Sequence, residues 1–280
     1  MYKFAEERVN AWSALLDVRR RLNDDWVFRG QPGDKPLRTS LDRALTAYGI
    51  PHGEAPGIEE QMIRDFRRRY DGPGSDLVSK DSLYCLALMQ HHGAPTRLLD
   101  VTYSFFIACL FAIDSLEPPN GNAVIWCIRK GWTLDTSRGK VNRIDDRNID
   151  AKRREESFER IYVTSQQTFV FHENPFRLNE RLIIQQGGFL CPGDVRSDFE
   201  ANLKGLAGWN SRGNVLKVVL HLSASLRREG MEDLLRMNVS RASLFPGLDG
   251  FAGSIAQRLP LLRSLASMGT GRGKARARRG

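Results

Sequence analysis

Residues 91–104 constrain the fold of this chain more than any other stretch, because they place polar side chains between two apolar segments. Pro95 has no backbone N–H and holds Ala94 in an extended conformation, while Gly93 admits backbone angles that other residues avoid. The apolar segment 83–89 should therefore end in a fixed corner. We expect the polar side chains after this corner to lie on the rim of a site.

Three side chains of this stretch have two candidate roles. Asp100, Thr102 and Ser104 can each accept a hydrogen bond from a free backbone N–H, which predicts that segment 105–114 begins as a capped helix. The same side chains can instead face a ligand. The two roles predict different directions, because a capping oxygen points at the first turn of its own helix.

Residue patterns predict both helices and strands along the rest of the chain. The predicted helices are 4–23, 37–48, 58–70, 83–90, 105–114, 226–237 and a last one through 255–259. The predicted strands are 26–31, 123–128, 163–172, 181–191 and 215–222. Strands and helices do not alternate regularly, so we expect an α+β fold rather than a doubly wound parallel sheet.

We assign residues 1–262 to a single domain that begins with the helix 4–23 and carries a polar peripheral insertion at 131–160, partly helical over 150–160. The formal net charge is +9, and residues 271–280 hold five basic residues and no acidic one. Removing those five charges from +9 leaves +4 for residues 1–270. We therefore expect 263–280 to be a disordered basic tail, which contacts nucleic acid or is simply solvated.

The cysteines and the apolar runs indicate the compartment. Cys85, Cys109, Cys127 and Cys191 lie among apolar neighbours without paired spacing, which predicts buried free thiols rather than disulfides or metal ligands. No apolar run is long enough to span a bilayer, and residues 1–10 are charged. We expect a cytoplasmic protein with no membrane partner. The sequence does not indicate its oligomeric state.

Common catalytic motifs are missing from the sequence, including the Walker loop, GxGxxG, GxSxG and HExxH. His91 and His92 are adjacent, and adjacent side chains in an extended segment point to opposite sides. We therefore predict no metal site. A metal-dependent nuclease is the least favoured class of function, because the sequence has no clustered Asp/Glu motif.

Four sequence blocks resemble the FRG domain, a bacterial and phage family named for its Phe-Arg-Gly motif. They read FRGQ at 28–31, QHHGAPTRLLDVT at 90–102, QQGGF at 185–189 and LFPGLDG at 244–250. Val101 stands where the family usually has tryptophan, and Gly188 where it has a larger apolar residue. The family often lies near toxin or anti-phage defence genes, so the resemblance implies such a role.

The chain also resembles, more weakly, the three-part pattern of ADP-ribosyltransferases. A strand ending in Phe-Arg-Gly is followed by Thr-x-Ser before a helix and then by a glutamate before a strand. In this chain the corresponding residues are Arg29, Thr102 with Ser104, and Glu180. The resemblance implies a mixed or antiparallel split sheet with surrounding helices. It also implies transfer of ADP-ribose from NAD to a macromolecule, such as nucleic acid or a protein.

In that reaction the glutamate would stabilise the oxocarbenium-like charge on the ribose, and the arginine would hold the pyrophosphate. The resemblance therefore implies that Arg29, Thr102 and Glu180 are catalytic. Besides Arg29, the residues that it assigns to the NAD site or the acceptor are Gln31, His91, Arg97, Asp100, Ser104 and Gln186.

One alternative follows from the third block. If Gln185 or Gln186, rather than Glu180, takes the third position, the site supplies an amide in place of a negative charge. The domain would then be a non-catalytic sensor that binds a nucleotide or a phage component without cleaving it.

Overall fold

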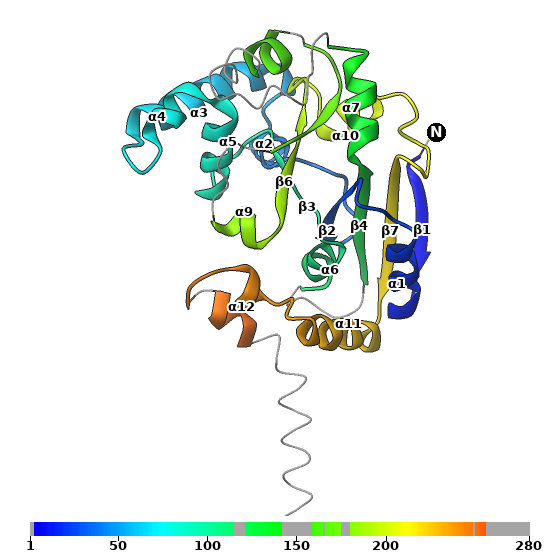
Figure 1. The fold of residues 1–280 in the computed structure, drawn as a ribbon. Helices are drawn as coiled ribbons and strands as arrows, with labels where there is room; N and C mark the ends of the chain where they lie inside the picture. The colour runs from blue at the N-terminus through cyan, green and yellow to red at the C-terminus, as the bar shows by residue number, and fades with distance from the viewer. Residues whose placement is uncertain are drawn as a thin grey trace, which may run out of the picture.

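The computed structural model describes residues 3–114, 121–141, 158–164, 166–174, 180–248 and 250–255. Within these residues, seven strands form one mixed sheet in the order β1-β7-β4-β2-β3-β6-β5, with helices packed around it (Figure 1). The strands are β1 (Ala5–Val9), β2 (Trp26–Pro32), β3 (Leu99–Thr102), β4 (Gly121–Arg129), β5 (Val170–Glu173), β6 (Gly187–Pro192) and β7 (Val215–Leu222).

Helices flank the sheet on both sides. They are α1 (Trp12–Arg20), α2 (Ser40–Tyr48), α3 (Ala55–Arg69), α4 (Ser75–Lys80), α5 (Ser82–His91), α6 (Phe105–Ile113), α7 (Lys130–Arg138), α9 (Glu180–Ile184), α10 (Phe199–Lys204), α11 (Ala224–Arg236) and α12 (Arg241–Leu244). A 3-10 helix, His52–Glu54, precedes α3, and a π-helix spans Glu159–Thr164. Mixed sheet and surrounding helices confirm the predicted α+β class.

Strand pairing is extensive on one side of β2 and minimal on the other. β2 pairs with β4 over seven residues, from Trp26 opposite Arg129 to Pro32 opposite Ala123. Its other neighbour, β3, shares one register pair with it, Phe28 opposite Thr102. β1 and β7 run parallel, and the other neighbouring strands are antiparallel. The sheet is therefore continuous but nearly interrupted between β2 and β3.

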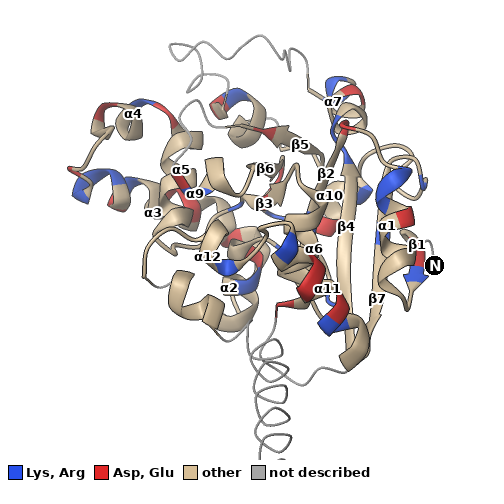
Figure 2. Cartoon of the chain, turned by 60° about the horizontal axis from the view of Figure 1, so that its bottom comes forward, with Lys and Arg blue, Asp and Glu red and all other residues tan. Residues whose placement is uncertain are grey.

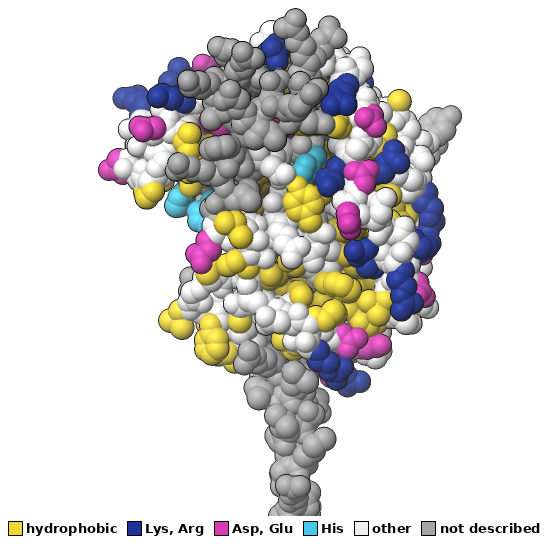
Figure 3. Space-filling model, viewed as in Figure 1, with side chains coloured by type: hydrophobic (Ala, Val, Ile, Leu, Met, Phe, Trp, Pro, Cys, Tyr) yellow, Lys and Arg dark blue, Asp and Glu magenta, His cyan; other side chains and the backbone are white. Residues whose placement is uncertain are grey.

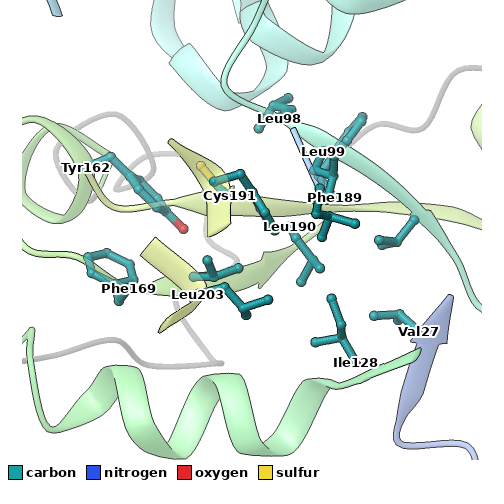
Figure 4. Close-up of a cluster of buried hydrophobic side chains, with 14 of the residues drawn as sticks. Val27, Leu98, Leu99, Ile128, Tyr162, Phe169, Phe189, Leu190, Cys191 and Leu203 are labelled. Carbon is teal, nitrogen blue, oxygen red and sulfur yellow. The ribbon is translucent and has the colours of Figure 1, made fainter. Parts of the chain in front are cut away.

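Two apolar cores lie on opposite faces of the sheet, because successive side chains of a strand alternate between faces. Along β4, Val124, Trp126 and Ile128 belong to one core, and the alternate residues 123, 125 and 127 belong to the other. Figure 4 shows part of the first core, where side chains from β2, β4 and β6 meet Tyr162 and Phe169.

The second core is organised by α6, which crosses β2 directly. Phe28 packs edge-on against Phe105, with ring centroids 5.3 Å apart. A Cβ at Gly30 would lie 1.7 Å from the carbonyl oxygen of Ala108. The glycine of the Phe-Arg-Gly motif is therefore required by helix packing.

The predicted N-terminal helix 4–23 is wrong in its first part. Residues Ala5–Val9 form the edge strand β1, and α1 begins only at Trp12. β1 pairs with β7 from Ala5 opposite Leu216 to Val9 opposite Leu220, and the ring of Phe4 packs against Trp126. Ladder hydrogen bonds and this aromatic contact outweigh the helical spacing of the apolar residues.

Two predicted strands are also wrong over part of their length. The segment 163–172 is strand only from Val170, because the π-helix Glu159–Thr164 occupies its start. The segment 181–191 begins as α9 and turns at Gln186, whose φ is 46°, before β6 starts. Both segments are rich in apolar residues, so strand and helix could not be distinguished by composition.

Other expectations have a plain outcome. The strands 26–31, 123–128 and 215–222 are confirmed, whereas the short strand β3 was not predicted. All four cysteines are buried free thiols. Every helix in the described part of the chain is too short or too polar to cross a membrane. Most of the predicted helical segment 150–160 and the whole tail 263–280 lie outside the described residues.

Candidate functional site

A small polar pocket lies where α5, β3, α9 and β6 meet. Its volume is about 60 Å³, and its lining consists of Ala87, Gln90, His91, Asp100, Arg181, Leu182, Gln185 and Phe189. Two of these residues, His91 and Asp100, belong to the predicted site. Apolar side chains gather on the surface at the same end of the molecule, around α12 (Figure 3).

Asp100 is the carboxylate of this pocket. It lies on β3 with an exposed side chain, and its Oδ1 accepts a hydrogen bond of 2.7 Å from the Gln90 amide. The carbonyl oxygen of the same amide accepts from the Thr96 hydroxyl. This chain of hydrogen bonds fixes the orientation of the carboxylate, so Asp100 presents a positioned acceptor to a ligand.

His91 ends α5 at the pocket. Partial burial and the neighbouring charges of His92 and Arg181 lower the pKa of His91 below its ordinary value. The imidazole is therefore neutral at pH 7 and can both donate and accept a hydrogen bond. Arg181, on the other wall, stacks over the Phe245 ring at 4.9 Å and brings a cation to the rim.

Arg29 supports this site from β2 without lining the pocket. Its Nη1 donates to the backbone oxygen of Asp100 at 2.7 Å, across the place where β2 and β3 diverge. Its Nε is buried without an acceptor among the described residues. Burial lowers the pKa of Arg29, and the negative charge of Asp100 opposes that shift. Arg29 therefore fixes the backbone of β3. Gln31, two residues further, donates to the carbonyl oxygen of Lys35 instead.

The hydroxyls of Thr102 and Ser104 bind local backbone. Thr102 Oγ1 donates to the carbonyl oxygen of Gln185 at 2.8 Å and accepts from Ser104 N at 3.0 Å. Ser104 Oγ accepts from Ile107 N at 3.4 Å, as a helix cap does. Ser104 therefore caps α6 as predicted, and Thr102 accepts from a backbone N–H, whereas the Asp100 carboxylate accepts from the Gln90 side chain. Both hydroxyls face local backbone, which is not the direction expected of ligand-binding groups.

The third block contributes one glutamine, Gln185, to the pocket. Glu180 is exposed at the start of the short helix α9 and does not line the pocket. Gln185 and Gln186 are the residues directly before β6, and the Gln185 side chain lines the pocket while donating to the carbonyl oxygen of Leu244. The residues directly before β6 therefore carry amide side chains and no carboxylate.

Arg97 lies elsewhere, in a separate cavity. It is buried and paired with Glu59 of α3. The pocket thus combines the predicted His91 and Asp100, and the alternative third-position residue Gln185, with five residues that were not predicted. These five are Ala87, Gln90, Arg181, Leu182 and Phe189. Gln90 and Phe189 stand at the edges of two motif blocks, which is the signal that could have found them. Within the described residues, no three His, Cys, Asp or Glu side chains form a metal cluster.

Comparison with known proteins bears on this region directly. The family model of the FRG domain matches residues 24–121, an interval that contains β2, α5, β3 and α6. Searches of the curated proteins and of the solved structures gave no match. The matched interval holds the Phe-Arg-Gly motif, the Asp100 carboxylate and the hydrogen bond from Arg29 to the backbone oxygen of Asp100. The chain therefore contains an FRG domain.

Proposed function

We propose that this FRG domain binds NAD, with one ring or ribose of the dinucleotide in the Asp100 pocket. The observation that carries the proposal is the position of three motif strands. β2, β3 and β6 lie side by side in the sheet in the order of their motifs along the chain. Neighbouring strands thus bring the Arg29, Asp100 and Gln185 regions together.

The lining suits part of a dinucleotide. The Asp100 carboxylate can accept hydrogen bonds from ribose hydroxyls, and Arg181 supplies a cation for a phosphate. Ligand pockets for whole drug-sized molecules measure about 300–1,000 Å³. A volume of about 60 Å³ encloses only a small part of NAD, so the rest of the ligand would lie on the open surface.

The side chains favour binding without cleavage. The transferase pattern that the chain resembles needs a carboxylate at its third position, and the residues before β6 are Gln185 and Gln186. Thr102 and Ser104 are committed to backbone hydrogen bonds. The function that fits is therefore a nucleotide sensor, and we place it in a defence or toxin system of the cytoplasm.

A second candidate function is ADP-ribosyl transfer with Asp100 as the carboxylate. In that reaction the bond between the ribose and nicotinamide breaks, nicotinamide leaves with the electron pair, and an acceptor nucleophile bonds to the ribose carbon. The observation in its favour is the exposed, oriented carboxylate of Asp100. The acceptor would be a nucleic acid or a protein.

Calorimetric titration with NAD tests the binding. We expect Asp100→Asn to weaken NAD binding at least tenfold, because the substitution removes the charge and keeps an oxygen for Gln90. Asp24→Asn, at an exposed site outside the pocket, serves as the matched control. Mass spectrometry then separates the candidates. Unchanged NAD supports the sensor, whereas nicotinamide release that Asp100→Asn abolishes supports transfer. No NAD binding at millimolar concentration overturns both.

A further inference from the structure

A second cavity has a different lining from the Asp100 pocket. It has a volume of about 750 Å³ and lies between α3, the π-helix Glu159–Thr164 and the turn 194–196. This volume is within the range of sites that enclose small organic ligands. Among the residues that the structure describes, the two cavities share none in their linings. They are therefore independent candidates for ligand binding.

The floor of this cavity is a rigid, neutralised ion pair. The side chains of Arg97 and Glu59 are 3% and 4% exposed, and Arg97 Nε donates to Glu59 Oε1 at 2.8 Å. Arg97 Nη1 also donates to the carbonyl oxygen of Tyr162 at 3.2 Å. Its guanidinium lies over the rings of Phe158 and Tyr162, at 5.5 and 5.9 Å. The floor thus offers fixed aromatic and planar surfaces, with its own charges paired.

The wall formed by α3 is cationic. Arg64, Arg67 and Arg68 line the cavity from successive turns of the helix, since residues three and four apart share one face. Figure 2 shows a basic stretch, coloured blue, along α3. Arg67 is held by the carbonyl oxygen of Val78 and the hydroxyl of Ser82, each at 2.9 Å. The wall is therefore partly preorganised.

The remaining charges of the lining leave an excess of arginine. Arg196 pairs with Asp194 at 2.8 Å, as Arg97 pairs with Glu59. Among the described residues of the lining, the other acidic side chains are Glu60 and Glu159, both exposed. Five arginines therefore stand against four acidic residues in this described lining, and the single excess positive charge favours an anion.

The opposite wall has two unusual backbone features. It is a π-helix, a conformation that is rare and often marks functional sites. Gln166, which also lines the cavity, has a φ of 48°, a left-handed conformation that is costly for a residue with a side chain. Such conformations persist where the surrounding structure imposes them, and here both border the same cavity.

From these observations we propose that the cavity binds a phosphate ester that carries an aromatic ring, such as a nucleoside diphosphate. The phosphates lie against Arg64 and Arg68 on α3. The ring lies against the apolar surface of Ile63, Phe158 and Val163, which all belong to the lining. This ligand site does not depend on NAD binding at Asp100.

Calorimetric titration with ADP tests the site in the full chain. The variant is the double substitution Arg64→Glu and Arg68→Glu, and both side chains are exposed, so the fold should persist. The matched control is Arg69→Glu, because Arg69 is exposed on the same helix and does not line the cavity. We expect the Kd for ADP to rise at least tenfold in the double variant and to stay within twofold in the control.

Three further titrations make the outcome decisive. Inorganic phosphate and adenosine should each bind at least tenfold more weakly than ADP, because each lacks one half of the recognised chemistry. The ADP site should persist in Asp100→Asn. The proposal is overturned by no ADP binding at millimolar concentration, by equal Kd values for phosphate and ADP, or by an ADP site that survives in the double variant.

Discussion

The side chains of Arg97 and Glu59, 38 residues apart in the sequence, form a buried ion pair between α3 and the segment before β3. The carbonyl oxygens of Tyr162 and Pro192 accept further hydrogen bonds from the guanidinium. The negative charge of Glu59 and the direct hydrogen bond raise the pKa of Arg97 against the effect of burial. The pair therefore joins four segments of the chain, and its loss should affect the whole fold.

The first prediction concerns this ion pair. Glu59→Gln should lower the free energy of unfolding by about 3–5 kcal/mol, because it leaves the Arg97 charge buried without its partner. Urea denaturation followed by circular dichroism measures the change. Glu60→Gln, on the exposed side of the same helix, should change stability by less than about 0.5 kcal/mol. Equal losses of unfolding free energy in the two variants would show that the buried ion pair does not contribute more to stability than an exposed glutamate.

The second prediction concerns the motif glycine. Gly30→Ala should destabilise the fold by about 3 kcal/mol or more, because the new methyl group collides with the backbone of α6. Gly57→Ala is the matched control, since Gly57 lies in α3 with open space around it. That change should stabilise the chain by about 0.5–1 kcal/mol through helix propensity. A melting temperature of Gly30→Ala equal to that of the unmodified chain would contradict the packing of α6 on β2.

The third prediction concerns pH. Burial, aided by the charge of Lys130, lowers the pKa of His172 from 6.5 to about 4. Protonation therefore favours the unfolded chain, and the stability due to neutral His172 is complete above pH 6.5 and is lost as the pH falls toward 4. His172→Gln should flatten the stability profile in this window, whereas His221→Gln at an exposed position should not. Unfolding midpoints measured between pH 4 and 7.5 test this prediction, and an equally steep profile in His172→Gln would contradict it.

The fourth prediction concerns the cysteines. Burial raises the pKa of the thiols of Cys109, Cys127 and Cys191, and a thiol rather than a thiolate is a poor nucleophile. A thiol reagent such as iodoacetamide should modify none of the four cysteines in the folded chain and all of them in urea. Mass spectrometry of intact protein counts the modified sites. Rapid labelling of the native protein at any of the four would show that its burial is incomplete.

The sequence predicted the elements whose patterns are local. Ser104 caps α6, as its side-chain chemistry predicts, and the strand 215–222 has the predicted bounds. The sequence-based predictions failed where pairing with a distant strand determines the secondary structure. Residues Ala5–Val9 are a strand because β7 lies beside them. β3 is a strand because β6 pairs with all four of its residues.

The candidate site was predictable in its motif residues and not in its geometry. Asp100 and His91 share a pocket because α5 and β3 meet at the corner formed by Gly93 and Pro95. Arg97, only three residues from Asp100, lines another cavity because its ion pair with Glu59 holds it there. Sequence spacing cannot show such a separation, because the partner of Arg97 lies on a distant helix.

Each residue of the Phe-Arg-Gly motif makes one structural contact. Phe28 packs on Phe105, Arg29 binds the backbone of β3, and Gly30 admits α6. Together these contacts hold α6, β2 and β3 against one another. None of the three motif residues lines the Asp100 pocket. In this chain the packing of α6, β2 and β3 is therefore enough to account for all three residues of the motif. The motif is evidence of architecture here, and a reaction needs evidence from other residues.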